Sequence, residues 1–365
     1  MTRFLSRRFD ALEGFAAADH RAAFAAFRTS APGLLSGAYE TGQLGLGVEA
    51  FRPAAEAALA AGEIADDAQA REFFESRFTP LAIVPETGTG LLTGYYEPVV
   101  EAADRPDDRF RFPLYRRPDD LVKIDDVNRP PGFDPEMRFG RRHGCGMIGE
   151  YFDRGEIEAG ALAGRGLEIA WLQSKVDAFF IHVQGSARLV LQDGREIRVG
   201  YAAKSGHAFT AIGRSLVADG ELTLAEADMT GIRAYLGSHP ERLDAILNRN
   251  RSFIFFAESE VEDPSLGPVG AAKVPLTPLA SIAVDRLLAT YGVPYFIASP
   301  TLRIDGAPFR RLMIAQDTGS AILGAARADI FVGTGEAAGA VAGTIRHGAE
   351  FFVLVPQELA ARLAR

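Results

Sequence analysis

The last third of the chain repeatedly alternates a short apolar run with a turn that contains glycine. Short runs rich in β-branched and aromatic side chains are typical of buried β-strands. A series of such strands without long helices between them favours a β-barrel or β-sandwich over a parallel α/β sheet. The predicted strands are residues 253–257, 280–285, 294–298, 312–316, 329–333 and 351–355.

The N-terminal part of the chain has a helical pattern instead. Residues 15–28 and 49–62 are rich in alanine, and residues 67–78 carry phenylalanines at helical spacing, so each segment predicts a helix. At 365 residues the chain is too long for one ordinary hydrophobic core. We therefore expect two domains.

Two stretches in the middle of the chain predict strands beside polar loops. Residues 91–100 (LLTGYYEPVV) form one predicted strand, in which adjacent Tyr95 and Tyr96 point to opposite faces, so only one can face a given cleft. Residues 178–183 (AFFIHV) form another, followed by a hairpin that turns at Asp193-Gly194. The polar breaks at 184–186 and 206–207 suit a sugar or peptide cleft.

The composition excludes some classes of function. A net charge of −9 provides no general basic field for nucleic acid, although neutral ligands such as glycans remain possible. The six histidines include no HxxxH pair, and the single cysteine, Cys145, can form neither an intrachain disulfide nor a multi-thiolate site, so no metal is expected. The sequence contains no apolar run of about 18 residues, so it predicts no membrane span. The N-terminal MTRFLSRRFDALEGF lacks the apolar region of a signal peptide and indicates a mature or an engineered start.

Three aspartates lie at the edges of predicted strands. Asp317 ends an apolar run and precedes Thr318-Gly319-Ser320, a position that suits a catalytic carboxylate at a cleft. An equally open interpretation is that Asp317 only accepts hydrogen bonds from turn amides. Asp285 and Asp329 could meet Asp317 at one cleft, where clustering would raise at least one pKa, or they could cap loops.

Two motif matches fail on context. Residues 317–320 (DTGS) match half of an aspartic protease site, but that chemistry needs two such carboxylates and the chain has one copy of the motif. Residues 333–338 imitate the GxGxxA dinucleotide fingerprint, but too little chain follows for the rest of that fold. A turn is the better interpretation of the second match.

Taken together, the motifs resemble the membrane-bound lytic murein transglycosylase A family, whose C-terminal domain is named for three aspartates. The matching segments run in family order from about residue 90 to the end. They are TGYYEP (93–98), RGLEIAWL (165–172), VDAFFIHVQGSARL (176–189), YAAKSGHAFTAIG (201–213), NRSFIFF (250–256), VPLTPLASIAVD (274–285) and AQDTGSAILGAARADIFVGTGEAAG (315–339).

The resemblance implies a fold that is mainly β with α-helices. A double-psi β-barrel domain would comprise residues 1–104 and 248–365, and residues 105–247 would form an inserted second β-barrel domain with a groove between the two. It also implies cleavage of the β-1,4 bond between N-acetylmuramic acid and N-acetylglucosamine in peptidoglycan, which leaves 1,6-anhydromuramoyl ends.

The site residues follow from the same resemblance. Asp317 would be the single catalytic acid and then base, which requires a protonated carboxyl, apolar surroundings and a raised pKa. Asp285 and Asp329 would support it. The substrate-binding residues would be Tyr95, Tyr96, Gln184, Gly185, Ser186, Lys204 and Gly206.

The implied setting is the periplasm of a Gram-negative bacterium, with outer-membrane association left open because a lipid-attachment cysteine is missing. The partners would be peptidoglycan glycan strands, with other cell-wall enzymes as an option, and neither nucleic acid nor a cofactor is expected. The family usually has glycine where this chain has Ala187, which would tighten that loop. An inactive peptidoglycan-binding scaffold is the alternative function, and the oligomeric state is open.

Overall fold

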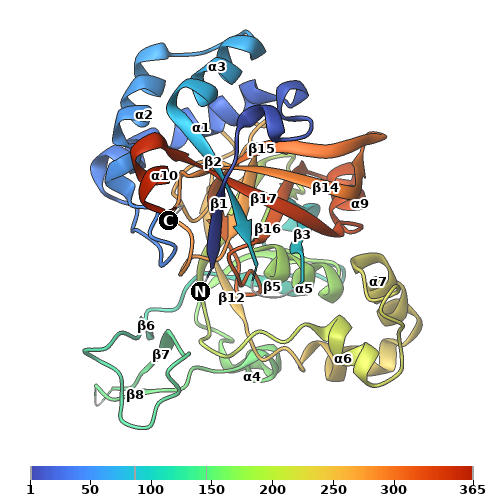
Figure 1. Cartoon of the computed structure of the whole chain (residues 1–365). Helices are drawn as coiled ribbons and strands as arrows, with labels where there is room; N and C mark the ends of the chain where they lie inside the picture. Colours follow the sequence, from blue (N-terminus) through green and yellow to red (C-terminus); the bar gives the residue numbers. More distant parts are fainter. Residues whose placement is uncertain (1, 86–87, 145, 364–365) are drawn as a thin grey trace. The chain divides into compact units, whose positions relative to one another are not determined.

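The computed structural model describes residues 2–85, 88–144 and 146–363. The chain folds into two compact units, one made of Met1–Tyr96 with Asp263–Arg365 and the other of Glu97–Glu262. Each unit is built on a β-sheet accompanied by helices, so the predicted mainly β fold with α-helices is confirmed (Figure 1). Cys145, on which the thiolate argument depended, lies outside the described residues.

The first unit is organised around eight strands in the order β1-β2-β17-β14-β15-β13-β16-β3. Because β17 also pairs with β3, the six strands from β17 to β3 close into a barrel. The strands are β1 Arg3–Ser6, β2 Phe78–Val84, β3 Gly90–Glu97, β13 Ser281–Val284, β14 Pro294–Ile304, β15 Ala307–Thr318, β16 Arg327–Thr334 and β17 Arg346–Pro356.

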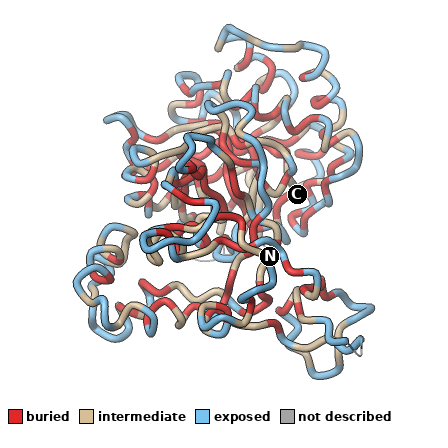
Figure 2. The backbone as a smooth tube through the Cα atoms, turned by 180° about the vertical axis from the view of Figure 1, so that it is seen from behind, coloured by how far each residue is buried: buried red, intermediate tan, exposed pale blue. Residues whose placement is uncertain are grey.

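The strands predicted in the last third of the chain are all present, because their apolar runs supply the buried core. All four residues of β13 are buried, and so is every residue of β15 from Leu312 to Gln316. Figure 2 shows buried residues concentrated in the interior and exposed residues on the outer stretches of the chain. β12, which lies in the second unit, completes the set of predicted strands.

The predicted N-terminal helices are present in the first unit. The first begins at His20 and not at residue 15, because the Asp19 side chain caps it by accepting from the Ala22 amide at 3.1 Å. Residues 15–17 form a short 3-10 turn before it. The helices of this unit are α1 His20–Ser36, α2 Val48–Ala61, α3 Asp67–Arg77, α9 Glu336–Ala342 and α10 Gln357–Leu363.

A buried glutamine attaches α1 to the barrel. Gln316 on β15 donates from Nε2 to the Ala26 carbonyl and to Ser30 Oγ, both at 2.8 Å, and accepts from the Ser281 hydroxyl. The pairing of β13 with β15 is irregular at this point, because Ile282 pairs with Ala315 and Ala283 with Asp317, which leaves Gln316 as an extra residue. Gln316 therefore attaches α1 to β15 directly before Asp317.

The second unit has a sheet of six strands in the order β12-β11-β10-β4-β9-β5 and a small sheet β6-β7-β8. A bridge between Arg116 and Phe256 brings the two ends of the larger sheet together, so this sheet is also barrel-like. The strands are β4 Val99–Ala103, β5 Phe112–Tyr115, β6 Leu121–Lys123, β7 Phe139–Arg142, β8 Ile148–Gly149, β9 Glu168–Leu172, β10 Ser186–Leu191, β11 Glu196–Lys204 and β12 Ile254–Ser259.

Several short helices complete the second unit. They are α4 Arg154–Glu156, α5 Lys175–Gln184, α6 Ile212–Ala218, α7 Met229–Ser238 and α8 Leu243–Leu247. Across the described residues of the whole chain, we find no helix with the length and apolarity that a membrane crossing requires.

The strand predicted at residues 178–183 is wrong, because these residues lie within helix α5. The Ser174 side chain caps this helix by accepting from the Asp177 amide at 3.1 Å, and Gly185 ends it in the left-handed conformation. A short apolar run fits a buried helix as well as a buried strand. Here the Ser174 cap favours the helix over the strand.

The hairpin predicted after this segment is confirmed, with a longer turn than expected. β10 and β11 pair up to Leu191, whose amide donates to the Arg195 carbonyl at 2.8 Å. Three residues, Gln192 to Gly194, therefore form the loop, and Gly194 takes the left-handed conformation common in such turns.

The chain passes from one compact unit to the other after Tyr96 and after Glu262, whereas the proposed domain boundaries lie after residues 104 and 247. Strand β4, which the proposed boundary at 104 left in the first domain, pairs with β9 and β10 of the second unit. Strand β12, beyond the proposed boundary at 247, pairs with β11. The groove between the domains stays a prediction.

Candidate active site

Neighbouring strands place two of the three aspartates around one small residue. Ala283 on β13 is the parallel partner of Asp317 on β15 and the antiparallel partner of Asp329 on β16. Laterally paired residues share a face, and adjacent strands are about 4.8 Å apart. The two acids therefore project from the same face of the sheet, with about 10 Å between their backbones.

The carboxylate of Asp317 accepts two hydrogen bonds. The Tyr95 hydroxyl donates to Oδ2 at 2.8 Å, and the Ala271 amide donates to Oδ1 at 3.0 Å. Asp317 is half-buried, and its neighbours Tyr95 and Ala283 belong to a buried apolar cluster that also contains Leu276, Ile322 and Phe331. This arrangement gives one carboxyl an apolar wall and a donor on each oxygen.

The Ala271 amide is positioned by a tight turn before β13. The Gly270 amide donates to the Val274 carbonyl at 2.9 Å, and Lys273 in this turn has a φ of 60°. A Cβ on Gly270 would lie 2.6 Å from the Gln316 carbonyl oxygen, so a glycine is required for the turn to lie so close to β15. The turn thereby brings a backbone donor against Asp317.

The environment of Asp317 favours its protonated form. Burial raises the pKa of Asp317, while the nearby Thr318 amide, the hydrogen bonds from the Ala271 amide and Tyr95, and the charge of Lys273 limit the rise. Burial and the nearby Asp317 charge raise the pKa of the Tyr95 hydroxyl well above its ordinary value. Tyr95 therefore keeps its proton and acts as a donor.

Asp329 has its own pair of polar neighbours. The Thr93 hydroxyl on β3 donates to Asp329 Oδ1 at 2.5 Å, and Arg327 Nη2 donates to Thr93 Oγ1 at 2.8 Å. Burial raises the pKa of Asp329 to about 6 and the charge of Asp317 adds to the rise, while Thr93 and Arg327 oppose it. Two coupled titratable carboxyls thus occupy this face.

Asp285 is buried and its carboxylate holds loop backbone. Its Oδ1 accepts from the Leu287 amide at 3.0 Å, and its Oδ2 accepts from the Gly324 amide at 2.8 Å. Asp285 therefore fixes the turn after β13 to the loop that follows β15. Its role as a supporting acid stays a prediction, and the contacts favour the loop-holding alternative.

The two tyrosines of β3 point to opposite faces, as predicted. Tyr95 contacts Asp317, whereas the buried ring of Tyr96 packs under α9, where a Cβ on Gly339 would lie 2.7 Å from it. Of the pair, the structure brings only Tyr95 to Asp317. Substrate contact by either ring stays a prediction.

The other predicted substrate-binding residues all lie in the second unit. Gln184 ends α5, Gly185 follows it with a φ of 79°, and Ser186 begins β10. Lys204 ends β11, and Gly206 lies two residues further on. Ala187 is fully buried in the apolar core of this unit, so its methyl group packs into the core. Sugar binding by the five predicted residues stays untested.

Gly206 is expected to be intolerant of a side chain. Its φ is 97°, and a Cβ there would lie 2.3 Å from the Phe139 carbonyl oxygen. Replacement of Gly206 by alanine should lower the free energy of unfolding by about 2 kcal/mol or more. The matched control is Gly200→Ala on β11, where no heavy atom lies within 4 Å of the new Cβ. Equal urea midpoints for the two variants would contradict this expectation.

Sequence reasoning assigned no role to Thr93, Arg327 or Ala271. Thr93 lies two residues before Tyr95 on a predicted strand, so the two share a face, and this spacing was an available signal. The contacts of Thr93 with β16 depend on strand pairing over more than 200 residues, which a single sequence does not reveal. The described residues include no cluster of three or more histidine, cysteine or acidic side chains that suits a metal ion.

Comparison with known proteins supports the resemblance. Residues 91–257 match the MltA specific insert domain, and residues 280–355 match the 3D domain. A membrane-bound lytic murein transglycosylase from Agrobacterium tumefaciens has 47% sequence identity, a TM-score of 0.93 and coverage of 99% of both chains. The chain belongs to the membrane-bound lytic murein transglycosylase A family.

Two comparisons with proteins from Escherichia coli add context. Membrane-bound lytic murein transglycosylase A of strain K12 is 33% identical over 274 residues, which is 73% of this chain and 66% of the relative. The chain thus spans about two thirds of that protein. The structure of E. coli MltA with bound chitohexaose is 27% identical with a TM-score of 0.70, and the match covers 97% of this chain and 94% of that one.

Proposed function

We propose that this protein is a peptidoglycan lytic transglycosylase. It would cleave the β-1,4 bond between N-acetylmuramic acid and N-acetylglucosamine and leave a 1,6-anhydromuramoyl end. Family membership supports this class of reaction. The chitohexaose complex of E. coli MltA supports a β-1,4-linked glycan as the ligand. Peptidoglycan strands in the periplasm of a Gram-negative bacterium are the proposed partner and setting.

The observation that carries the mechanism is one carboxyl with a donor on each oxygen. Asp317 has a pKa raised by burial, with the Tyr95 hydroxyl at 2.8 Å and the Ala271 amide at 3.0 Å. The protonated form can give its proton to the glycosidic oxygen as the C1–O bond breaks. The resulting carboxylate is stabilised by the two donors until it takes a proton back.

The attacking group would be the C6 hydroxyl of the same muramic acid residue. Its oxygen forms the new bond to C1, and Asp317 takes its proton, so the acid is regenerated and no water is consumed. Ordinary glycosidases need a second carboxylate as nucleophile or base. Because this attack is intramolecular, binding mainly has to hold the ring in a reactive shape.

We further propose that the predicted residues of the second unit, Gln184, Gly185, Ser186, Lys204 and Gly206, bind N-acetyl and hydroxyl groups of the glycan. Asp285 is proposed to act indirectly, by holding the Gly324 loop.

Digestion of purified sacculi tests the proposal. Mass spectrometry of the soluble products should show muropeptides one water lighter than hydrolase products. Products that are hydrated throughout would reject the transglycosylase reaction. Binding to sacculi with no soluble product would instead favour the alternative, an inactive peptidoglycan-binding scaffold.

Replacement of Tyr95 by phenylalanine should shift the pH dependence of the reaction. The Tyr95 hydrogen bond lowers the pKa of Asp317, so its loss should raise that pKa and move the alkaline limb of kcat/KM to higher pH. The maximal rate should fall by about tenfold, because the carboxylate loses one donor. An unchanged alkaline limb would show that Tyr95 has no influence on the acid.

A further inference from the structure

A chain of hydrogen bonds runs from β16 to β3 and back to β16. Arg327 donates from Nη2 to Thr93 Oγ1 at 2.8 Å, and Thr93 donates to Asp329 Oδ1 at 2.5 Å. Arg327 and Asp329 are two residues apart on β16 and so share a face. The guanidinium is itself fixed, because Nη1 donates to the Ala328 carbonyl.

The donors and acceptors in this chain run in one direction, from Arg327 through Thr93 to Asp329. A guanidinium has donors and no acceptor, so Thr93 must accept from Arg327. The single proton of the Thr93 hydroxyl is then directed at Asp329 Oδ1. This arrangement matches an ionised Asp329, which accepts on that oxygen.

The same strand provides a hydroxyl to each acid. Thr93 and Tyr95 are two residues apart on β3, and they donate to Asp329 and Asp317 respectively. Only the hydroxyl on Asp329 is backed by a fixed positive charge, that of Arg327. A hydrogen bond from a donor polarised by a cation favours a carboxylate more strongly than one from an isolated hydroxyl.

Several charged and titratable groups lie close enough to these two acids to influence their protonation. Asp329 is influenced by Arg327 and Asp317, and Arg346 in turn acts on Arg327. Asp317 is influenced by Tyr95 and Lys273, and its charge also acts on Tyr291 and Tyr95. The charge of Asp317 raises the pKa of Asp329, and because this coupling is reciprocal, a charged Asp329 opposes ionisation of Asp317.

We propose that Thr93 is a positioning residue which, together with Arg327, favours the ionised form of Asp329, and that the charge of Asp329 in turn helps Asp317 to keep its proton. This inference rests on the proposed function, in which Asp317 must carry that proton before the glycosidic bond breaks. Asp329 then contributes by its charge alone. Its negative field holds the proton on Asp317 and is available to the positive charge that develops on the sugar ring.

The pH profile of kcat/KM tests this role with Thr93→Val, which keeps the shape of the side chain and removes its hydroxyl. Without the donor, Asp329 takes up a proton more readily. A neutral Asp329 no longer opposes ionisation of Asp317, so the alkaline limb should move to lower pH by about half a unit to one unit. The conservative variant Thr93→Ser should restore the limb to its wild-type position.

Asp329→Asn provides a second, independent test. It mimics a permanently neutral Asp329 and should move the alkaline limb in the same direction. The double variant Thr93→Val with Asp329→Asn should show no further shift, because Thr93 acts only through Asp329. An alkaline limb that stays in place in both single variants, or additive shifts in the double variant, would overturn the proposal.

The outcomes also separate this inference from the proposed function. If wild-type protein releases no anhydro products, the proposed function fails. If wild-type protein releases them and the limb of Thr93→Val stays in place, only the role of Thr93 fails. Tyr95→Phe, expected to move the limb to higher pH, shows that the assay resolves shifts in either direction.

Discussion

Replacement of Asp317 by asparagine should lower the rate of muropeptide release from sacculi by about 10³-fold. Asparagine has nearly the same size, and its carbonyl oxygen can still accept from the Ala271 amide that now donates to Asp317 at 3.0 Å. It has no proton of suitable acidity to give to the glycosidic oxygen and no carboxylate to take one back. The expected loss is therefore in kcat, with binding of the glycan retained.

The matched control is Asp305→Asn. Asp305 is exposed in the turn between β14 and β15 of the same unit, with a φ of 52° that asparagine also adopts readily. Its release rate should equal that of the wild type. An Asp317→Asn variant that is folded and keeps more than about a tenth of the wild-type rate would rule out Asp317 as the proton donor.

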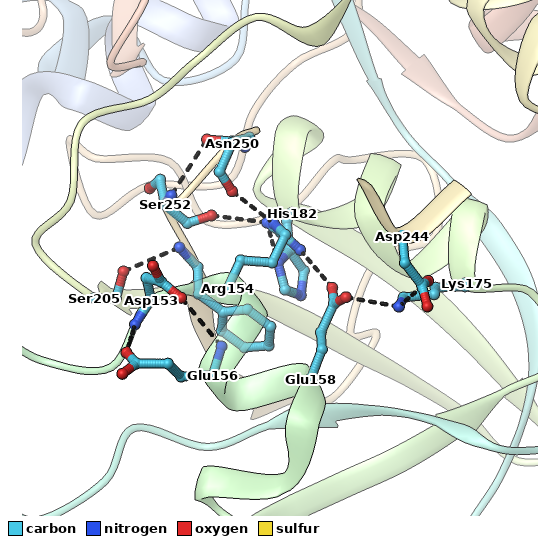
Figure 3. Close-up of polar contacts among 11 residues, drawn as sticks. Asp153, Arg154, Glu156, Glu158, Lys175, His182, Ser205, Asp244, Asn250 and Ser252 are labelled. Carbon is cyan, nitrogen blue, oxygen red and sulfur yellow. Dashed lines mark hydrogen bonds and ion pairs between the residues drawn. The ribbon is translucent and has the colours of Figure 1, made fainter. Parts of the chain in front are cut away.

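Replacement of Arg154 by methionine should destabilise the second unit by about 3–5 kcal/mol. Arg154 is 1% exposed and lies at the centre of a polar network (Figure 3). It donates to the carbonyls of Asn250 at 3.0 Å and Ser252 at 2.7 Å, and it pairs with Glu158 at 3.3 Å. Methionine fills similar volume but leaves these buried acceptors without their donor.

A buried histidine completes this network. Arg154 Nη2 lies 3.1 Å from His182 Nδ1, and burial together with the Arg154 charge holds the pKa of His182 well below its ordinary value. His182 is therefore neutral and accepts from Arg154, so the variant also removes a donor from the ring.

Arg251→Met is the control for this loss, since the Arg251 side chain is 56% exposed and pairs with Asp153 at 2.9 Å at the surface. An exposed ion pair contributes about 1 kcal/mol at most. Urea unfolding followed by circular dichroism should separate the two variants clearly. Similar unfolding midpoints for Arg154→Met and Arg251→Met would contradict the account of the buried network.

The sequence predicted the strands of the barrel because their signal is local. The runs at 294–298, 312–316, 329–333 and 351–355 are apolar and bounded by turns, and each lies within a strand. The run at 178–183 is equally apolar and is a helix, because Ser174 caps it and Gly185 ends it. Those two residues were visible in the sequence, and a capping test would have corrected the assignment.

The candidate site was predictable in part. Asp317 could be singled out from its position at a strand end, and the alternation of Tyr95 and Tyr96 predicted that only one would face it. The contact of Thr93 with Asp329 joins residues 236 apart in sequence and depends on how the barrel closes. Strand register over such distances is set by packing of the whole core and not by local pattern. For the same reason, the sequence left open whether Asp285 caps a loop.

The most direct test of the single-acid mechanism is digestion of sacculi in water enriched in heavy oxygen, followed by mass spectrometry of the muropeptides. Attack by the C6 hydroxyl predicts anhydro products that carry no heavy oxygen, because water does not enter the bond that forms at C1. Products with heavy oxygen at the muramic acid reducing end would show that water is the nucleophile and would contradict the mechanism.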